Sequence, residues 1–129
     1  MKYLISIMTL LGCSSSPSSA QEGYKIDKDN DTIEFYFSGA STLKSVYVSA
    51  NFNKWVNYDG QTENSEDWRM KYDTDAKQWK LKKQFKAIRS FGSFLEFGFL
   101  VEGKLINAPR SAKNTIYCIG YGRRYVIKE

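Results

Sequence analysis

Alternation of apolar and polar residues runs through most of the chain and predicts a domain built from short β-strands. Between residues 32 and 38, Ile33, Phe35 and Phe37 alternate with Glu34, Tyr36 and Ser38, and Gly39 ends the run. A period of two is typical of a strand that buries one face. Similar runs predict further strands at 45–50, 68–72, 79–85, 94–101, 104–107, 115–119 and 124–127. No stretch shows a convincing 3.6-residue period, so we expect no substantial helix.

The connections between these runs carry turn signals. Asp73 and Asp75 favour a turn because aspartate side chains hydrogen-bond nearby backbone groups, and Glu102-Gly103 suits a two-residue hairpin. The polar stretch 58–67 is longer than a tight turn, and such loops are often functional. Seven to nine short strands in about 100 residues predict an all-β fold, an immunoglobulin-like antiparallel β-sandwich.

The first residues predict an export signal with a lipid anchor. Lys2 precedes a short apolar run, which ends in Leu10-Leu11-Gly12-Cys13 and resembles the lipobox of bacterial lipoproteins, where the cysteine is lipidated. We therefore expect a signal peptide at 1–12, lipidated Cys13 with a flexible tether over 13–30, and the folded domain over 31–129. The expected location is the bacterial cell envelope, with the lipid in the outer membrane or on the periplasmic face.

Composition and charge narrow the possible functions. The chain has no histidine, which removes the commonest acid–base group and the commonest metal ligand. We find no nucleophile–base arrangement, metal-ligand spacing or phosphate loop, so we expect a non-enzyme without a cofactor or metal. The net charge of +5 is modest, and we expect no nucleic-acid partner for an exported protein. Anionic envelope polymers are the expected partner of the basic surface if it binds any polymer.

A set of landmarks along the chain resembles one known family. The landmarks are Val46-Tyr47-Val48-Ser49-Ala50-Asn51-Phe52-Asn53-Lys54-Trp55, then Met70, Trp79, Phe97-Gly98-Phe99-Leu100-Val101-Glu102-Gly103-Lys104, and Asn107-Ala108-Pro109. In this order they resemble the glycogen-binding domain, the carbohydrate-binding module of the family 48 type that occurs in the β-subunit of the AMP-activated protein kinase. The resemblance covers roughly residues 32–127 and implies an early-set immunoglobulin-like sandwich that binds α-glucan.

The resemblance also implies a binding site, which this chain keeps only in part. Trp55 matches the first of the family's two sugar-stacking tryptophans, but the second falls at Leu105 and the sugar-bonding lysine falls at Gly98. The loss would remove roughly 1–3 kcal/mol of stacking and roughly 1.5–3 kcal/mol of hydrogen bonding to a charged group. Tyr58, Trp68 and Phe94 are possible substitute platforms. Asn114 is a candidate for the family's sugar-bonding asparagine.

Two functions therefore remain open at the level of the sequence. One is a lipid-anchored carbohydrate-binding module that recognises an α-glucan or an envelope polysaccharide through Trp55, Tyr58, Trp68, Phe94 and Asn114. The other is an envelope lipoprotein whose sandwich binds a protein partner and no glycan. Phe52 and Trp79 are expected in the core, and Cys118 is expected to be a small buried hydrophobic residue. Trp55 suits burial and stacking about equally.

Overall fold

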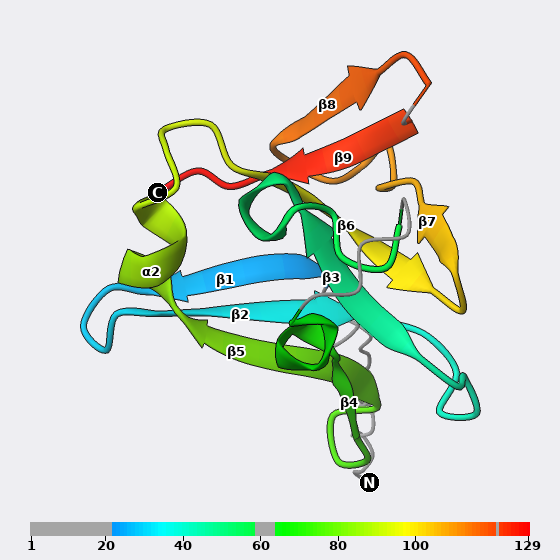
Figure 1. The fold of residues 1–129 in the computed structure, drawn as a ribbon. Helices are drawn as coiled ribbons and strands as arrows, with labels where there is room; N and C mark the ends of the chain where they lie inside the picture. The colour runs from blue at the N-terminus through cyan, green and yellow to red at the C-terminus, as the bar shows by residue number, and fades with distance from the viewer. Residues whose placement is uncertain (1–21, 59–63, 121) are drawn as a thin grey trace, which may run out of the picture.

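The computed structural model of the chain describes residues 22–58, 64–120 and 122–129 (Figure 1). Within these ranges, nine strands form two antiparallel sheets that pack as a sandwich, together with one short α-helix. The predicted all-β sandwich is therefore confirmed. The expected signal peptide and Cys13 lie outside the described residues. No helix in the described ranges is both long enough and apolar enough to cross a membrane.

The first sheet has the strand order β1-β2-β5-β4. Its strands are β1 (Gly23–Asp27), β2 (Thr32–Phe37), β5 (Gln78–Gln84) and β4 (Lys71–Asp73). The apolar residues predicted to face inward on β2, which are Ile33, Phe35 and Phe37, are all buried. The alternation along this strand therefore decides which face lies against the core.

Strand β1 corrects the expected domain boundary. The flexible tether was expected to extend over 13–30, but Gly23–Asp27 pairs with β2 in a register that joins Gly23 to Tyr36 and Asp27 to Thr32. Tyr24 and Ile26 pack against the core from this strand. A strand with only two apolar residues in five shows little alternation. Because a serine-rich segment precedes it, the sequence favours a flexible tether there. The folded domain therefore begins before residue 31.

The second sheet has the order β3-β6-β9-β8, and β7 pairs with β6 as well. Its strands are β3 (Val46–Ala50), β6 (Glu96–Val101), β7 (Lys104–Ile106), β8 (Thr115–Cys118) and β9 (Gly122–Val126). The orders β1-β2-β5-β4 and β3-β6-β9 follow the A-B-E-D and C-F-G orders of a constant-type immunoglobulin domain. Glu102 and Gly103, with φ of 48° and 86°, make the predicted β6–β7 hairpin turn.

Aromatic side chains fill the space between the two sheets. The Phe97 ring stacks on Tyr125 with centroids 5.0 Å apart and meets Phe35 edge-on at 4.9 Å. Trp79 is buried as predicted, and its Nε1 donates a hydrogen bond to the Ala40 carbonyl at 3.0 Å. Phe52 is partly buried and packs against the same core. Burial of such large rings supplies much of the folding free energy of a small domain.

Several predicted strand ends differ from the structure. Phe85 begins the helix α2 (Phe85–Arg89) instead of ending β5, and the helix lies beside the ends of β1, β2 and β5 (Figure 1). Trp68 ends the 3₁₀-helix η3 (Ser65–Trp68), so the strand expected at 68–72 begins only at Lys71. Cys118, expected to be buried, is partly exposed because its strand is the last in its sheet. Among the described residues it forms no disulfide.

Candidate functional site

Three positions of the expected glucan site map to the outer face of the second sheet. Because Val48 and Phe97 point into the core, their strand neighbours Ser49 and Gly98 point to the opposite face. Leu105 lies on this face as well, since a Cβ atom at position 98 would be 3.1 Å from its Cδ1 atom. The loop that carries Trp55 folds back over the face, and Ser49 Oγ donates a hydrogen bond to the Val56 carbonyl at 3.0 Å.

Asn53 holds the loop of residues 51–58, here called the Trp55 loop. Its Oδ1 accepts hydrogen bonds from the amides of Ala50, at 2.9 Å, and Val56, at 3.3 Å, and its Nδ2 donates to the Val48 carbonyl at 2.9 Å. The loop starts with the 3₁₀-helix η2 (Asn51–Asn53), and Trp55 then adopts a φ of 51°. Positive φ is unusual for a bulky residue, so the hydrogen bonds of Asn53 stabilise an uncommon backbone conformation.

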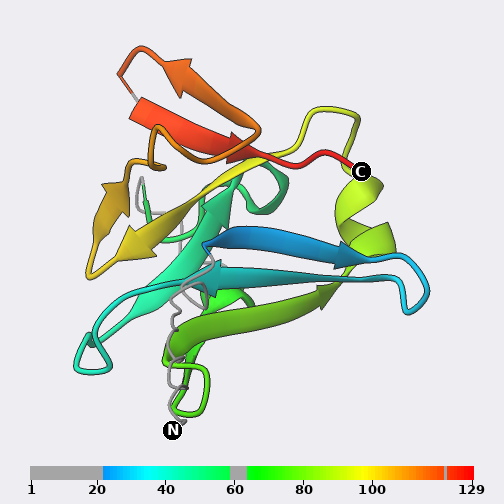
Figure 2. The same ribbon diagram turned by 180° about the vertical axis from the view of Figure 1, so that it is seen from behind.

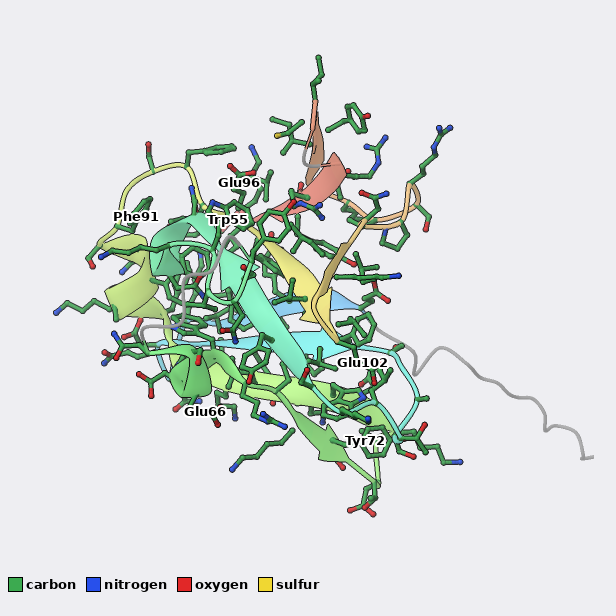
Figure 3. All side chains as sticks on the ribbon, turned by 45° about the vertical axis from the view of Figure 1, so that its right-hand side comes forward. Trp55, Glu66, Tyr72, Phe91, Glu96 and Glu102 are labelled. Atoms are coloured by element: carbon green, nitrogen blue, oxygen red, sulfur yellow. The ribbon has the colours of Figure 1, made fainter. Side chains whose placement is uncertain are left out.

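Asn51 ties the Trp55 loop to the start of β6. Its Nδ2 donates to the Phe94 carbonyl, and its Oδ1 accepts from the Glu96 amide, each at 3.0 Å. Trp55 and Glu96 accordingly lie at the same end of the molecule, far from Glu102 (Figure 3). Phe94 is 46% exposed. The structure therefore brings Trp55, Tyr58 and Phe94 to one end of the second sheet.

Arg124 occupies the space above Gly98. This arginine is only 2% exposed, and its Nη1 donates to the carbonyls of Ile106, at 2.8 Å, and Arg123, at 2.9 Å. A Cβ atom at position 98 would lie 3.1 Å from Nη1. A side chain at position 98 would therefore crowd both Arg124 and Leu105, so glycine suits the path that the Arg124 side chain takes across the sheet.

Burial governs the electrostatics around Arg124. It lowers the pKa of the guanidinium, against the opposing attraction of Tyr58, Cys118 and Glu96. Burial also raises the pKa of the Glu96 carboxyl, and the charge of Arg124 partly offsets this rise. Two hydrogen bonds of Arg124 go to carbonyls of its own sheet, so this side chain helps to hold the outer face together.

Trp68 packs against the Phe52 side of the Trp55 loop, and Asn114 lies apart from the other candidates. The Trp68 ring packs 5.6 Å from Phe52, and Lys83 Nζ lies 4.5 Å from its centroid, a distance typical of a cation–π contact. Asn114 is exposed, precedes β8, and donates from Nδ2 to the Tyr24 hydroxyl at 3.3 Å. The five candidate residues therefore do not form one continuous aromatic platform.

An apolar edge strand is the feature that the sequence analysis missed. Strand β8 ends the second sheet, and the β8–β9 hairpin extends from the sandwich at the end opposite β4 (Figures 1 and 2). The exposed fractions are 38% for Ile116, 64% for Tyr117 and 91% for Ile119. The stretch 115–119 contains no charged residue. This would have pointed to a binding edge only if the strand had already been known to lie at the end of its sheet.

The described ranges contain no group of three or more histidine, cysteine, aspartate or glutamate residues placed to hold a metal ion. Compared with models of known protein families and with curated protein sequences, the chain matches none. The resemblance to the glycogen-binding domain therefore stays a prediction, and function has to be inferred from the geometry of the described residues.

Proposed function

We propose that the protein is a non-catalytic binding module that holds a protein partner at strand β8. The observation that carries this proposal is the exposure of Ile116 and Tyr117 on β8, the last strand of the second sheet, and of Ile119 in the turn just after it. A strand in this position pairs on one side only, so its other side presents backbone donors and acceptors. An extended segment of a partner can add to such an edge and cover its apolar side chains.

The contrast between β8 and the two end strands of the first sheet supports this proposal. At the ends of the first sheet, β1 carries Lys25 and Asp27, and β4 carries Lys71 and Asp73. Charged side chains are the usual means by which proteins discourage edge-to-edge pairing. Strand β8 has no such protection, so a partner strand would meet little repulsion there. Burial of its apolar surface would add about 25 cal/mol for each Å² removed from water.

Site-specific crosslinking in intact cells tests the proposal. A photoreactive residue replaces Ile119 in the full chain, and the matched control places it at Phe91, which is also an exposed apolar residue. We expect one protein to be trapped from position 119 and not from position 91, and Tyr117→Lys to abolish the crosslink at an unchanged melting temperature. The same products from both positions would contradict the proposal.

Glycan binding is the second candidate, because Trp55, Tyr58 and Phe94 share one end of the second sheet. Trp55 and Tyr58 are both partly exposed, and an exposed aromatic ring can stack on the apolar face of a sugar. On this proposal the full chain is retained on amylopectin gels, and Trp55→Ala abolishes retention without lowering the melting temperature. Tyr117→Ala, on β8, is the control and leaves retention intact. Equal retention of all three proteins would rule out α-glucan binding at this end.

A further inference from the structure

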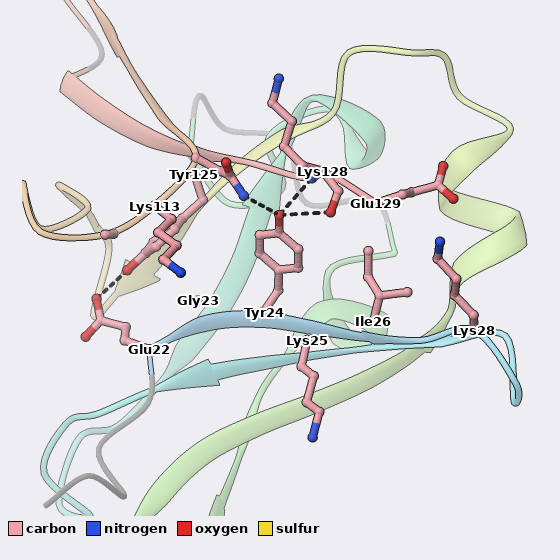
Figure 4. A pocket seen from close by; sticks show the side chains of 12 residues that line it. Glu22, Gly23, Tyr24, Lys25, Ile26, Lys28, Lys113, Tyr125, Lys128 and Glu129 are labelled. Atoms are coloured by element: carbon pink, nitrogen blue, oxygen red, sulfur yellow. Dashed lines mark hydrogen bonds between the residues drawn. The ribbon is translucent and has the colours of Figure 1, made fainter.

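A cavity with several lysines in its lining lies beside β1, away from the residues proposed to bind a protein or a glycan. It has a volume of about 410 Å³ and lies between β1, the segment that leads into β8, and the C-terminal residues (Figure 4). Its lining includes four lysines from these three segments, namely Lys25, Lys28, Lys113 and Lys128. Strand β1 is the last strand of its sheet, so the cavity opens along an unpaired edge.

The positive charge of this β1 cavity is poorly compensated. Among the described residues, none of the four lysine ammonium groups forms an ion pair. The two side-chain carboxylates in the lining are both engaged. Glu22 Oε2 accepts a hydrogen bond from the Tyr125 hydroxyl at 2.6 Å, and Glu129 Oε1 pairs with Arg89 Nη1 at 3.1 Å. The Lys25 side chain points to the opposite side of β1 from Tyr24 (Figure 4), so the lysine side chains available to the cavity are those of Lys28, Lys113 and Lys128, and their positive charge favours an anionic ligand.

The wall of the cavity is held in place by the Tyr24 hydroxyl (Figure 4). This oxygen accepts hydrogen bonds from the Lys128 amide at 2.7 Å and from Asn114 Nδ2 at 3.3 Å, and it lies 3.2 Å from the Val126 carbonyl, to which it can donate. Asn114 is thereby oriented on the rim, and among the described residues its Oδ1 accepts no hydrogen bond. That oxygen is an acceptor suited to a sugar hydroxyl.

The chemistry of the lining indicates the class of ligand. We propose that the β1 cavity binds an anionic glycan through its carboxylate groups, as in a uronic-acid polymer. The lysines would contact the carboxylates, Asn114 would contact a hydroxyl group, and the apolar parts of Tyr24, Ile26 and Ala112 would cover a CH face of the ring. A phosphate polymer would use the lysines alone, and a neutral glucan would use none of them.

The binding of oligogalacturonate to the full chain tests this proposal by titration calorimetry. We expect binding that weakens as salt is added, because the lysines are exposed to solvent. The double variant K28Q/K113Q should weaken it about three- to tenfold, as expected for two solvent-exposed charge pairs. The control K71Q/K104Q removes the same charge at exposed lysines outside the cavity and should change affinity less than about twofold.

The Asn114→Ala variant and a second probe test the sugar class. Lys28, Lys113 and Lys128 all remain in this variant, which should weaken oligogalacturonate binding and leave polyphosphate binding unchanged. Equal losses in K28Q/K113Q and K71Q/K104Q would overturn the proposal, because net charge alone would then explain them. Tighter binding of polyphosphate than of oligogalacturonate, or no binding of oligogalacturonate, would overturn it as well. None of these outcomes bears on the partner at β8, which is tested separately.

Discussion

At the scale of single residues, the outer face of the second sheet is notable for the buried charge of Arg124. Arg124 is almost fully buried, although a guanidinium is costly to remove from water. The carbonyls of Ile106 and Arg123 compensate part of this cost, and Glu96 lies close enough to act on the charge. The absence of a side chain at Gly98 is what makes the arrangement possible.

The substitution Gly98→Ala tests this packing. The added Cβ would lie 3.1 Å from both Arg124 Nη1 and Leu105 Cδ1, so neighbouring atoms must shift. We expect a loss of about 1–3 kcal/mol in the free energy of unfolding, as is usual for an overpacked site. Urea unfolding measures it. Gly92→Ala is the control, because nothing lies within 4 Å of a Cβ there; equal losses at both positions would contradict the proposed contact.

Glu96 gives the protein a pH-dependent term in its stability. Since burial raises the pKa of this carboxyl in the folded state, folding loses stability as the pH rises from the carboxyl's unfolded pKa through its folded one. Glu96→Gln stays neutral at every pH. Its melting temperature, relative to that of the unaltered protein, should therefore increase between about pH 4 and pH 7. Thermal scans across this range check it, and a constant difference would show that burial does not control this group.

At the scale of elements, the Trp55 loop depends on one side chain. Asn53 makes three hydrogen bonds to the backbone, which stabilise the turn between η2 and Val56. Asn51 and Asn53 suit this turn because asparagine side chains hydrogen-bond to nearby backbone. The positive φ values of Lys54, Trp55 and Asn57 and the path of the loop over the sheet were not predictable, since they depend on contacts with β3 and β6.

Truncation of Asn53 should destabilise the domain through this loop. We expect Asn53→Ala to cost about 1–3 kcal/mol in the free energy of unfolding, because buried backbone groups lose their partners. Asn53→Asp keeps the Oδ1 acceptor and loses the Nδ2 donor, so it should cost less. Denaturant titration of the three proteins gives the order. A loss in the aspartate variant as large as in the alanine variant would show that the amide donor alone matters.

Strands that bury one face were predictable, and elements defined by contacts across the fold were not. Alternation located β2, β3, β5 and β6 because each places large apolar side chains in the core. Helix α2 has five residues, too few to show a helical period. Strand β1 was missed because the tether was expected to extend to residue 30. Its Tyr24 side chain is fixed by β9 and the C-terminal residues, which lie far along the chain.

The candidate site was predictable only in part. Trp55 and Phe94 lie at one end of the second sheet, yet nothing in their sequence spacing indicates that Asn51 joins their segments. Likewise, Asn114 was proposed from the resemblance alone, and its position beside Tyr24 arises from the packing of β1 against the segment before β8. The exposure of β8 depends on its being the last strand in its sheet, which an uncharged run does not reveal.

At the scale of the whole molecule, three surfaces lie on different parts of the sandwich. The exposed edge strand β8, the end that carries Trp55 and Phe94, and the β1 cavity share no residue among those that carry each argument. Part of the net charge of +5 lies around the β1 cavity, whose lining includes Lys28, Lys113 and Lys128. A protein held near a membrane by one end could therefore engage two ligands at once.

The predicted lipid anchor can be tested by substituting each of the two cysteines of the chain in turn. The chain contains only Cys13 and Cys118, so they form a matched pair. In bacterial cells given an alkyne-labelled fatty acid, we expect the full chain to incorporate label and to sediment with membranes. Cys13→Ser should abolish both, and Cys118→Ser should change neither. Label that persists in Cys13→Ser would contradict the anchor and the envelope location derived from it, and would leave the binding proposals unaffected.

The contact between Arg124 and Gly98 also constrains how a form of this sandwich with lysine at position 98 could arise by mutation. A lysine introduced first at position 98 meets the guanidinium at the Cβ atom. Loss of Arg124 first removes a donor from the carbonyls of Ile106 and Arg123, of which the second still accepts from the Ala108 amide, and leaves an unfilled volume above the glycine. Either single step is therefore expected to lower stability, although the double substitution restores a compatible pair. Such reciprocal sign epistasis would make single-step changes between the glycine and lysine forms unfavourable. Sequences of similar proteins should therefore carry both Gly98 and Arg124 or neither.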